Sequence, residues 1–178
     1  MHVMLPRESQ SPTQFEAFPP HQVGGGRRAS RAESLHAHAL SRLGGELIGT
    51  FGPGRGAAFW LLLQGPTLHF AGELLTPDLV GWRREHSSLP DTLSLLPDWV
   101  CEVLTPSSGS LERLTKLPLY ARAGVRQVWL VDPERRTLEV LRLEGRRYSL
   151  LALHSGDDNV RAEPFQSLTL PLRLLWGE

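Results

Sequence analysis

The sequence predicts an α/β domain built on a mixed sheet. Short apolar runs typical of covered strands occur together with two helical segments, at residues 30–43 and 111–123. The second helix lies between two apolar strands, 99–104 and 127–131, and this order predicts a parallel crossover. With 178 residues, 40% of them hydrophobic, the chain is long enough for one domain with a core.

The first segment differs in composition from the rest. Residues 1–29 contain several prolines and the run Gly24-Gly25-Gly26, with few periodic apolar positions. We expect a poorly ordered or divergent arm there, and a folded domain over residues 30–178. The helix at 30–43 can be capped by Ser30, and Gly44-Gly45 is expected to end it.

The remaining elements follow from apolar runs and turn residues. Pro118 lies inside the second helix and should bend it or belong to a first turn, because proline lacks an amide donor. The stretches on either side of Gly145 predict a hairpin, and the tail is expected to add a strand or to cover the core. The further strands predicted are 46–51, 59–63, 76–82, 137–143 and 148–153, and the tail is 168–176.

Charge and composition exclude several classes of protein. Nineteen Lys and Arg balance nineteen Asp and Glu, so the chain is not a basic protein that coats nucleic acid. The single cysteine, Cys101, allows no intramolecular disulfide, which suits a reducing compartment. The apolar runs are too short to cross a bilayer and the first residues lack a signal-peptide core. We expect a soluble, cytoplasmic protein.

Two acidic residues stand in apolar surroundings. Side chains alternate along a strand, so Glu102 shares one face of 99–104 with Val100 and Leu104. A carboxylate placed there should be paired, protonated or bound to a cation. Asp78 has a similar setting, and two acids on adjacent strands can share one ion. Oxygen ligands favour Mg²⁺ or Mn²⁺ over zinc.

A lysine on the following helix completes a possible phosphodiesterase site. Lys116 could reach back over the end of the strand, and Glu112 precedes it by one helical turn. A metal ion can activate water and neutralise phosphate charge, while a lysine stabilises the developing anion or positions the water.

The order of the motifs resembles a known family. The segments 97–107, 116–121, 124–125 and 129–133, with 77–83 upstream, are similar to the bacterial Uma2-type endonucleases, a branch of the PD-(D/E)xK superfamily. The resemblance runs from about Leu35 to the C-terminus. It implies a restriction-endonuclease-like core, a mixed central sheet flanked by helices.

The resemblance also implies roles for individual residues. Asp78 and Glu102 match the metal ligands. The superfamily lysine normally stands where this chain has Leu104, and Lys116 matches the migrated lysine of this family. Glu112 replaces an aspartate of the relatives. The strand pair that precedes their first helix is replaced by the glycine-rich residues 23–29.

Other interpretations stay open for these residues. Asp78 could be a turn residue, and Glu102 could form an ion pair with Lys116 alone. Asp98 could flank the site or cap its strand. A nucleophilic role for Cys101 is less favoured than a buried one, because Cys101 lies on the strand face opposite Glu102.

The sequence therefore supports two functional hypotheses. The first is an endonuclease that requires a divalent metal, with DNA as its expected substrate. In it, Asp78 and Glu102 bind the metal, Lys116 assists the reaction and Glu112 orients the lysine. The second is a degenerate nuclease domain that binds DNA or a protein without turnover. Superfamily analogy allows a homodimer.

Overall fold

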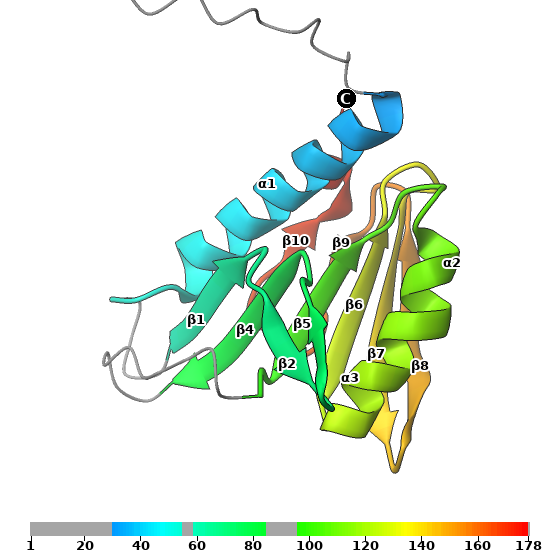
Figure 1. Cartoon of the computed structure of the whole chain (residues 1–178). Helices are drawn as coiled ribbons and strands as arrows, with labels where there is room; N and C mark the ends of the chain where they lie inside the picture. The colour runs from blue at the N-terminus through cyan, green and yellow to red at the C-terminus, as the bar shows by residue number, and fades with distance from the viewer. Residues whose placement is uncertain (1–29, 55–58, 85–95, 178) are drawn as a thin grey trace, which may run out of the picture.

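A six-stranded mixed sheet forms the centre of the molecule (Figure 1). This computed structural model describes residues 30–54, 59–84 and 96–177. Strands β5 and β6 run parallel, and every other neighbouring pair in the sheet is antiparallel. The predicted α/β class and the parallel crossover are confirmed. The strands, in sheet order, are β1 (Phe59–Gln64), β4 (Leu79–Arg84), β5 (Trp99–Val103), β6 (Gln127–Asp132), β7 (Thr137–Glu144) and β8 (Arg147–Ser155).

Helices and short strands cover both faces of this sheet (Figure 1). One face packs against α1 and the C-terminal segment. The other packs against a helical segment, residues 109–123, and a small hairpin. The first layer comprises α1 (Arg31–Phe51), β9 (Asn159–Val160), β10 (Leu170–Pro171) and η3 (Leu172–Leu175). The second comprises β2 (Leu68–Phe70), β3 (Glu73–Leu75), α2 (Gly109–Leu111), η2 (Glu112–Lys116) and α3 (Leu117–Ala123).

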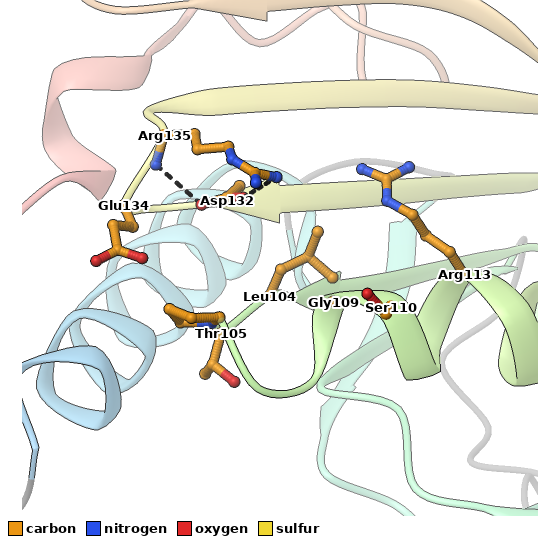
Figure 2. A pocket seen from close by; sticks show the side chains of 9 residues that line it. Leu104, Thr105, Gly109, Ser110, Arg113, Asp132, Glu134 and Arg135 are labelled. Carbon is orange, nitrogen blue, oxygen red and sulfur yellow. Dashed lines mark hydrogen bonds and ion pairs between the residues drawn. The ribbon is translucent and has the colours of Figure 1, made fainter.

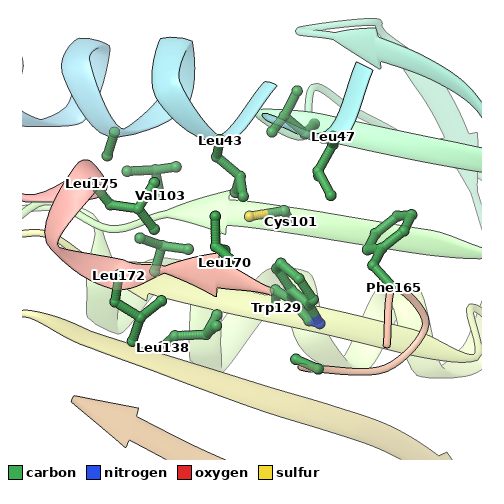
Figure 3. Close-up of a cluster of buried hydrophobic side chains, with 14 of the residues drawn as sticks. Leu43, Leu47, Cys101, Val103, Trp129, Leu138, Phe165, Leu170, Leu172 and Leu175 are labelled. Atoms are coloured by element: carbon green, nitrogen blue, oxygen red, sulfur yellow. The ribbon is translucent and has the colours of Figure 1, made fainter. Parts of the chain in front are cut away.

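The core under α1 is rich in leucine and aromatic residues (Figure 3). Leu43 and Leu47 of α1 point toward the sheet, where Trp129 lies, and Phe165 of the C-terminal segment belongs to the same core (Figure 3). The rings of Trp99 and Trp129 meet edge to face with centroids 5.3 Å apart. Phe165 packs edge to face on both tryptophans, at 5.0 and 5.6 Å. The C-terminal tail thus covers the core, as predicted.

The first helix is longer than the sequence predicted. Its N-terminus is the expected one, because Ser30 and Glu33 form a capping box. The predicted stop at Gly44-Gly45 and the predicted strand 46–51 are wrong, since α1 continues to Phe51. Leu43 and Leu47 lie one turn apart and both are buried. Their packing outweighs the low helix propensity of the two glycines.

The strand predicted over 76–82 begins only at Leu79. Pro77 has no amide hydrogen to contribute to a ladder, so pairing starts after it. Asp78 therefore precedes β4 rather than lying within it, which corrects its predicted place on a strand. The β2–β3 hairpin was not predicted from the sequence. The predicted arm 1–29 lies outside the described residues.

The second helical segment is confirmed, with one irregularity. It runs from Gly109 to Ala123 and contains a π-helical turn at Glu112–Lys116. Pro118 occupies the first turn of α3, where its missing amide donor costs little. Gly124 ends the helix with φ of 96°, a conformation that favours glycine. Among the described residues, no helix is long and apolar enough to cross a membrane.

The continuous α1 helix predicts that Gly45→Ala stabilises the protein. Gly45 is exposed in the helix interior, and an added Cβ would meet no atom within 4 Å. Alanine should therefore raise the free energy of unfolding by about 0.5–1 kcal/mol, measured by urea titration. The matched control is Gly124→Ala, which should destabilise because φ is positive there. A loss of stability in Gly45→Ala would contradict a continuous helix.

Candidate active site

Glu102 lies on the central strand β5 and faces the helical segment 109–123. The alternation predicted for this strand is observed: Val100 and Leu104 join the core on the side of that helical segment, and Cys101 joins the core under α1. Glu102 is only 1% exposed. An ionised carboxylate at this depth needs hydrogen-bond donors or a cation.

Two side chains from the helical segment contact both oxygens of Glu102. The Lys116 ammonium lies 3.0 Å from Oε2, as a hydrogen bond and an ion pair. The Tyr120 hydroxyl donates a short hydrogen bond to Oε1. Lys116 and Tyr120 are four residues apart, so they project from the same side of the helical segment.

Glu112 joins the site through the π-helical turn. Its Oε1 lies 3.5 Å from the Lys116 ammonium. Its Oε2 is buried and has no hydrogen-bond partner among the described residues. Such turns are frequent at functional sites, where they change which side chains share a helix face. A buried oxygen without a donor is a position that water or a cation could satisfy.

Asp78 is fixed at the end of β5 by a backbone contact. The amide of Val103 donates a hydrogen bond to Oδ2 of Asp78 at 2.7 Å. Because Val103 follows Glu102 in β5, this contact holds the Asp78 carboxylate near Glu102. His36 of α1 places Nε2 3.2 Å from Oδ1. The side chains of Asp78 and His36 are 22% and 27% exposed. The site therefore reaches solvent at Asp78 and is closed at Glu102.

The surroundings shift the proton affinities of these groups. Burial raises the pKa of Glu102 to about 7, and the neighbouring Lys116 only partly opposes this. Burial is the largest single influence on Lys116 and lowers its pKa. The attraction and hydrogen bond to Glu102, together with the charges of Glu112 and Asp78, outweigh burial and raise the pKa of the lysine. The hydrogen bond to Asp78 raises the pKa of His36. Burial also raises the pKa of Tyr120, which keeps its hydroxyl protonated as a donor.

The donor set fits a hard divalent cation. Asp78 and Glu102 offer carboxylate oxygens. The negative charge of Asp78 raises the pKa of Glu102 further, because the two carboxylates repel each other. A cation between them would relieve this repulsion. Within the described ranges, no three His, Cys, Asp or Glu side chains gather as a complete metal centre. Mg²⁺ commonly takes one or two carboxylates and fills its other positions with water.

The four residues singled out from the sequence lie in one region. Glu102, Lys116 and Glu112 are in direct contact, and Asp78 joins them through the amide of Val103. Sequence reasoning missed Tyr120, although its four-residue spacing from Lys116 was a usable signal. His36 was assigned no role from the sequence, and the structure places it in contact with Asp78.

Other residues considered from the sequence have structural contacts. Cys101 is fully buried, and burial raises the pKa of its thiol well above the ordinary value. That environment disfavours a nucleophile. Asp98 accepts a hydrogen bond from the amide of Arg83 and so joins β4 to the start of β5. Asp132 accepts one from the amide of Arg135 at the turn after β6.

A separate pocket of about 370 Å³ opens beyond the ends of β5 and β6 (Figure 2). Its lining includes Thr105, Arg113 and Asp132. The dashed lines in Figure 2 mark the contacts of Asp132 with Arg135. Arg113 forms an ion pair with Glu139. The lining of this pocket contains none of the four candidate residues, Asp78, Glu102, Glu112 and Lys116. The candidate active site is therefore separate from it.

The sequence matches a family model over residues 26–173. The family is Uma2, described as "Putative restriction endonuclease". The chain belongs to this family. The match covers most of the chain, including all four residues singled out from the sequence, and it confirms the resemblance inferred from the motifs. No curated protein matches the chain.

The fold also matches a solved structure. A crystal structure described as a putative nuclease belonging to DUF820, from Anabaena variabilis ATCC 29413, superposes with a TM-score of 0.63. The two sequences are 19% identical, and the match covers 80% of each chain. At this identity the similarity establishes the fold of the Uma2 chain and leaves its chemistry to be argued from the site.

Burial of Glu102 predicts a pH-dependent effect of Glu102→Gln on stability without metal. The pKa of Glu102 is about 7 in the folded protein, above its ordinary value of 4.5. Wild type should therefore lose stability, relative to the variant, as pH rises from about 4.5 through about 7. The relative loss should reach on the order of 1–3 kcal/mol by pH 8, measured by urea unfolding in EDTA.

The matched control is Glu134→Gln, which removes one carboxylate from the surface. Its effect on the free energy of unfolding should be within about 0.5 kcal/mol at pH 5 and at pH 8. An effect of Glu102→Gln that is equal at pH 5 and pH 8 would contradict the burial argument.

Proposed function

We propose that this Uma2 chain is an endonuclease that requires a divalent metal and cleaves DNA. The observation that carries the proposal is the buried Glu102 carboxylate, which contacts Lys116 and Tyr120 and lies next to the anchored Asp78. A structural ion pair would need no second acid beside it. Two acids with one lysine supply what metal-assisted phosphodiester hydrolysis requires.

Asp78 and Glu102 are the proposed metal ligands, and Mg²⁺ or Mn²⁺ is the proposed ion. When bound, the ion would supply an activated water and neutralise charge on the phosphate. Asp78 presents its carboxylate from the partly exposed end of the site, where a phosphate can approach. The Val103 amide holds that carboxylate in place and limits its freedom to rotate.

Lys116 is proposed to act by its charge. Its pKa is raised above the ordinary lysine value, so it stays protonated near neutral pH and cannot accept a proton from water there. A protonated ammonium stabilises the negative charge that develops on the phosphate in the transition state. Its side chain is 19% exposed, which lets it contact a bound substrate.

Three further residues are proposed to position these groups. Glu112 contacts the Lys116 ammonium from the preceding turn and orients it. Tyr120 donates to Glu102 and fixes the orientation of its carboxylate. His36 contacts Asp78 in the same way from α1. Partners of this kind keep a metal ligand in one rotamer and adjust its basicity.

The family description supports a nucleic-acid substrate, and we propose DNA. Since the formal net charge is zero, the overall charge of the chain does not attract DNA. Affinity must come from local cationic side chains and from the metal. Binding should therefore depend on metal more than it would in a basic nuclease.

The direct test is cleavage of plasmid and single-stranded DNA with Mg²⁺ and with Mn²⁺. We expect wild type to nick DNA, and EDTA to stop it. Glu102→Gln and Lys116→Ala should each lower the rate by about 100-fold or more. The first removes a proposed metal ligand, and the second removes the cation that stabilises the transition state. Glu134→Gln is the matched surface control and should cleave like wild type.

Cleavage that survives in Glu102→Gln would contradict the proposed site. Folded wild type that binds metal and DNA without cleaving would contradict the enzyme and favour the non-catalytic binding domain. Circular dichroism of each variant separates a lost active site from a lost fold.

A further inference from the structure

Strand β8 is an open edge of the central sheet. Its nine residues pair with β7, and no described strand pairs with its other side (Figure 1). A strand of this length extends roughly 30 Å and presents a row of backbone donors and acceptors along its outer side. Soluble proteins usually protect such an edge with lysine, proline or a covering segment. β8 contains neither lysine nor proline, and its one irregularity is a bulge at Leu151, which has no ladder partner in β7.

The same strand exposes a cluster of leucines. Leu150, Leu151 and Leu153 are 56%, 42% and 58% exposed. They are three of the seven large apolar side chains that are exposed among the described residues. A cluster of exposed apolar groups on a strand with one open edge is typical of a surface that is covered by a partner.

Opposite charges mark the two ends of β8. Arg146 and Arg147 are exposed where the strand begins, and Asp157 and Asp158 are exposed just beyond its end. Neither arginine forms an ion pair with a described residue, although Arg147 stands opposite the exposed Glu144 in the β7–β8 ladder. The carboxylate of Asp158 accepts a hydrogen bond from the amide of Ser155. The order along the edge is therefore basic, apolar, acidic.

We propose that β8 pairs antiparallel with β8 of a second copy of this chain. Antiparallel self-pairing is isologous: a twofold axis near the strand centre turns the basic end of one copy onto the acidic end of the other. In a register centred on Leu151, Arg147 lies opposite Ser155 of the second copy and close to its Asp157. At the centre Leu151 lies opposite Leu151 of the second copy, with Leu150 opposite Ala152 and Leu153 opposite Ser149. The two six-stranded sheets become one.

The charge pattern favours a second copy over a nucleic acid. A polyanion would be attracted to the arginine end but repelled by the two aspartates, and it would leave the leucines exposed. A second β8 satisfies all three parts of the pattern at once, and it does so twice because of the symmetry. The pairs of Arg147 with Asp157 at both ends would also fix the register of the two strands.

The test is the mass in solution, measured by light scattering and sedimentation at about 10–100 μM, a range suited to moderate interfaces. Wild type should have twice the mass of one chain. Arg147→Glu and Asp157→Arg should each weaken the dimer by about tenfold or more, because each places like charges together at both ends. The double variant Arg147→Glu/Asp157→Arg should restore it, since the pairs are re-formed with reversed signs.

Two more variants separate a specific interface from a general charge effect. Leu153→Lys places a charge in the apolar centre and should give a monomer. Arg31→Glu makes the same charge change as Arg147→Glu on an exposed residue of α1, and it should leave the dimer intact. Monomeric wild type, or a double variant no stronger than the two single variants, would overturn the proposal.

Discussion

The burial of one carboxylate is the constraint on which the rest of this site depends. Glu102 stands in the middle of the sheet at 1% exposure, where an unpaired negative charge would destabilise the fold strongly. Lys116 and Tyr120 each satisfy one of its oxygens. They leave the pKa of the acid raised to about 7, so the protein alone stabilises the anion incompletely. A divalent cation would complete that stabilisation.

The fold supplies these partners through the parallel crossover between β5 and β6. The chain leaves β5 one residue after Glu102 and returns along the sheet as the helical segment, so that Lys116 and Tyr120 lie over the strand they serve. The π-helical turn adds Glu112 to the same side. Asp78 comes from the residue just before the neighbouring strand β4, and the amide of Val103 anchors it. One strand therefore organises all four candidate residues.

Sequence patterns predicted what depends on local rules. Alternation along 99–104 placed Glu102 on the right face, and helical spacing placed Glu112 beside Lys116. The failures lie where tertiary contacts decide the outcome. Gly44 and Gly45 resemble a helix end, yet the burial of Leu47 keeps the helix intact. The spacing of Tyr120 from Lys116 could mark it as a candidate, but its contact with Glu102 joins residues 18 apart, so helical spacing alone could not establish that contact.

The most direct test of the central claim is Mn²⁺ binding measured by calorimetry. We expect one site in wild type, no detectable binding in Glu102→Gln, and affinity about 10–100-fold lower in Tyr120→Phe, which loses the hydroxyl that orients the ligand. Tyr148→Phe is the matched control, because that hydroxyl donates to the carbonyl of Val125 instead. Equal Mn²⁺ affinity in wild type and Glu102→Gln would contradict the assignment of Glu102 as a metal ligand.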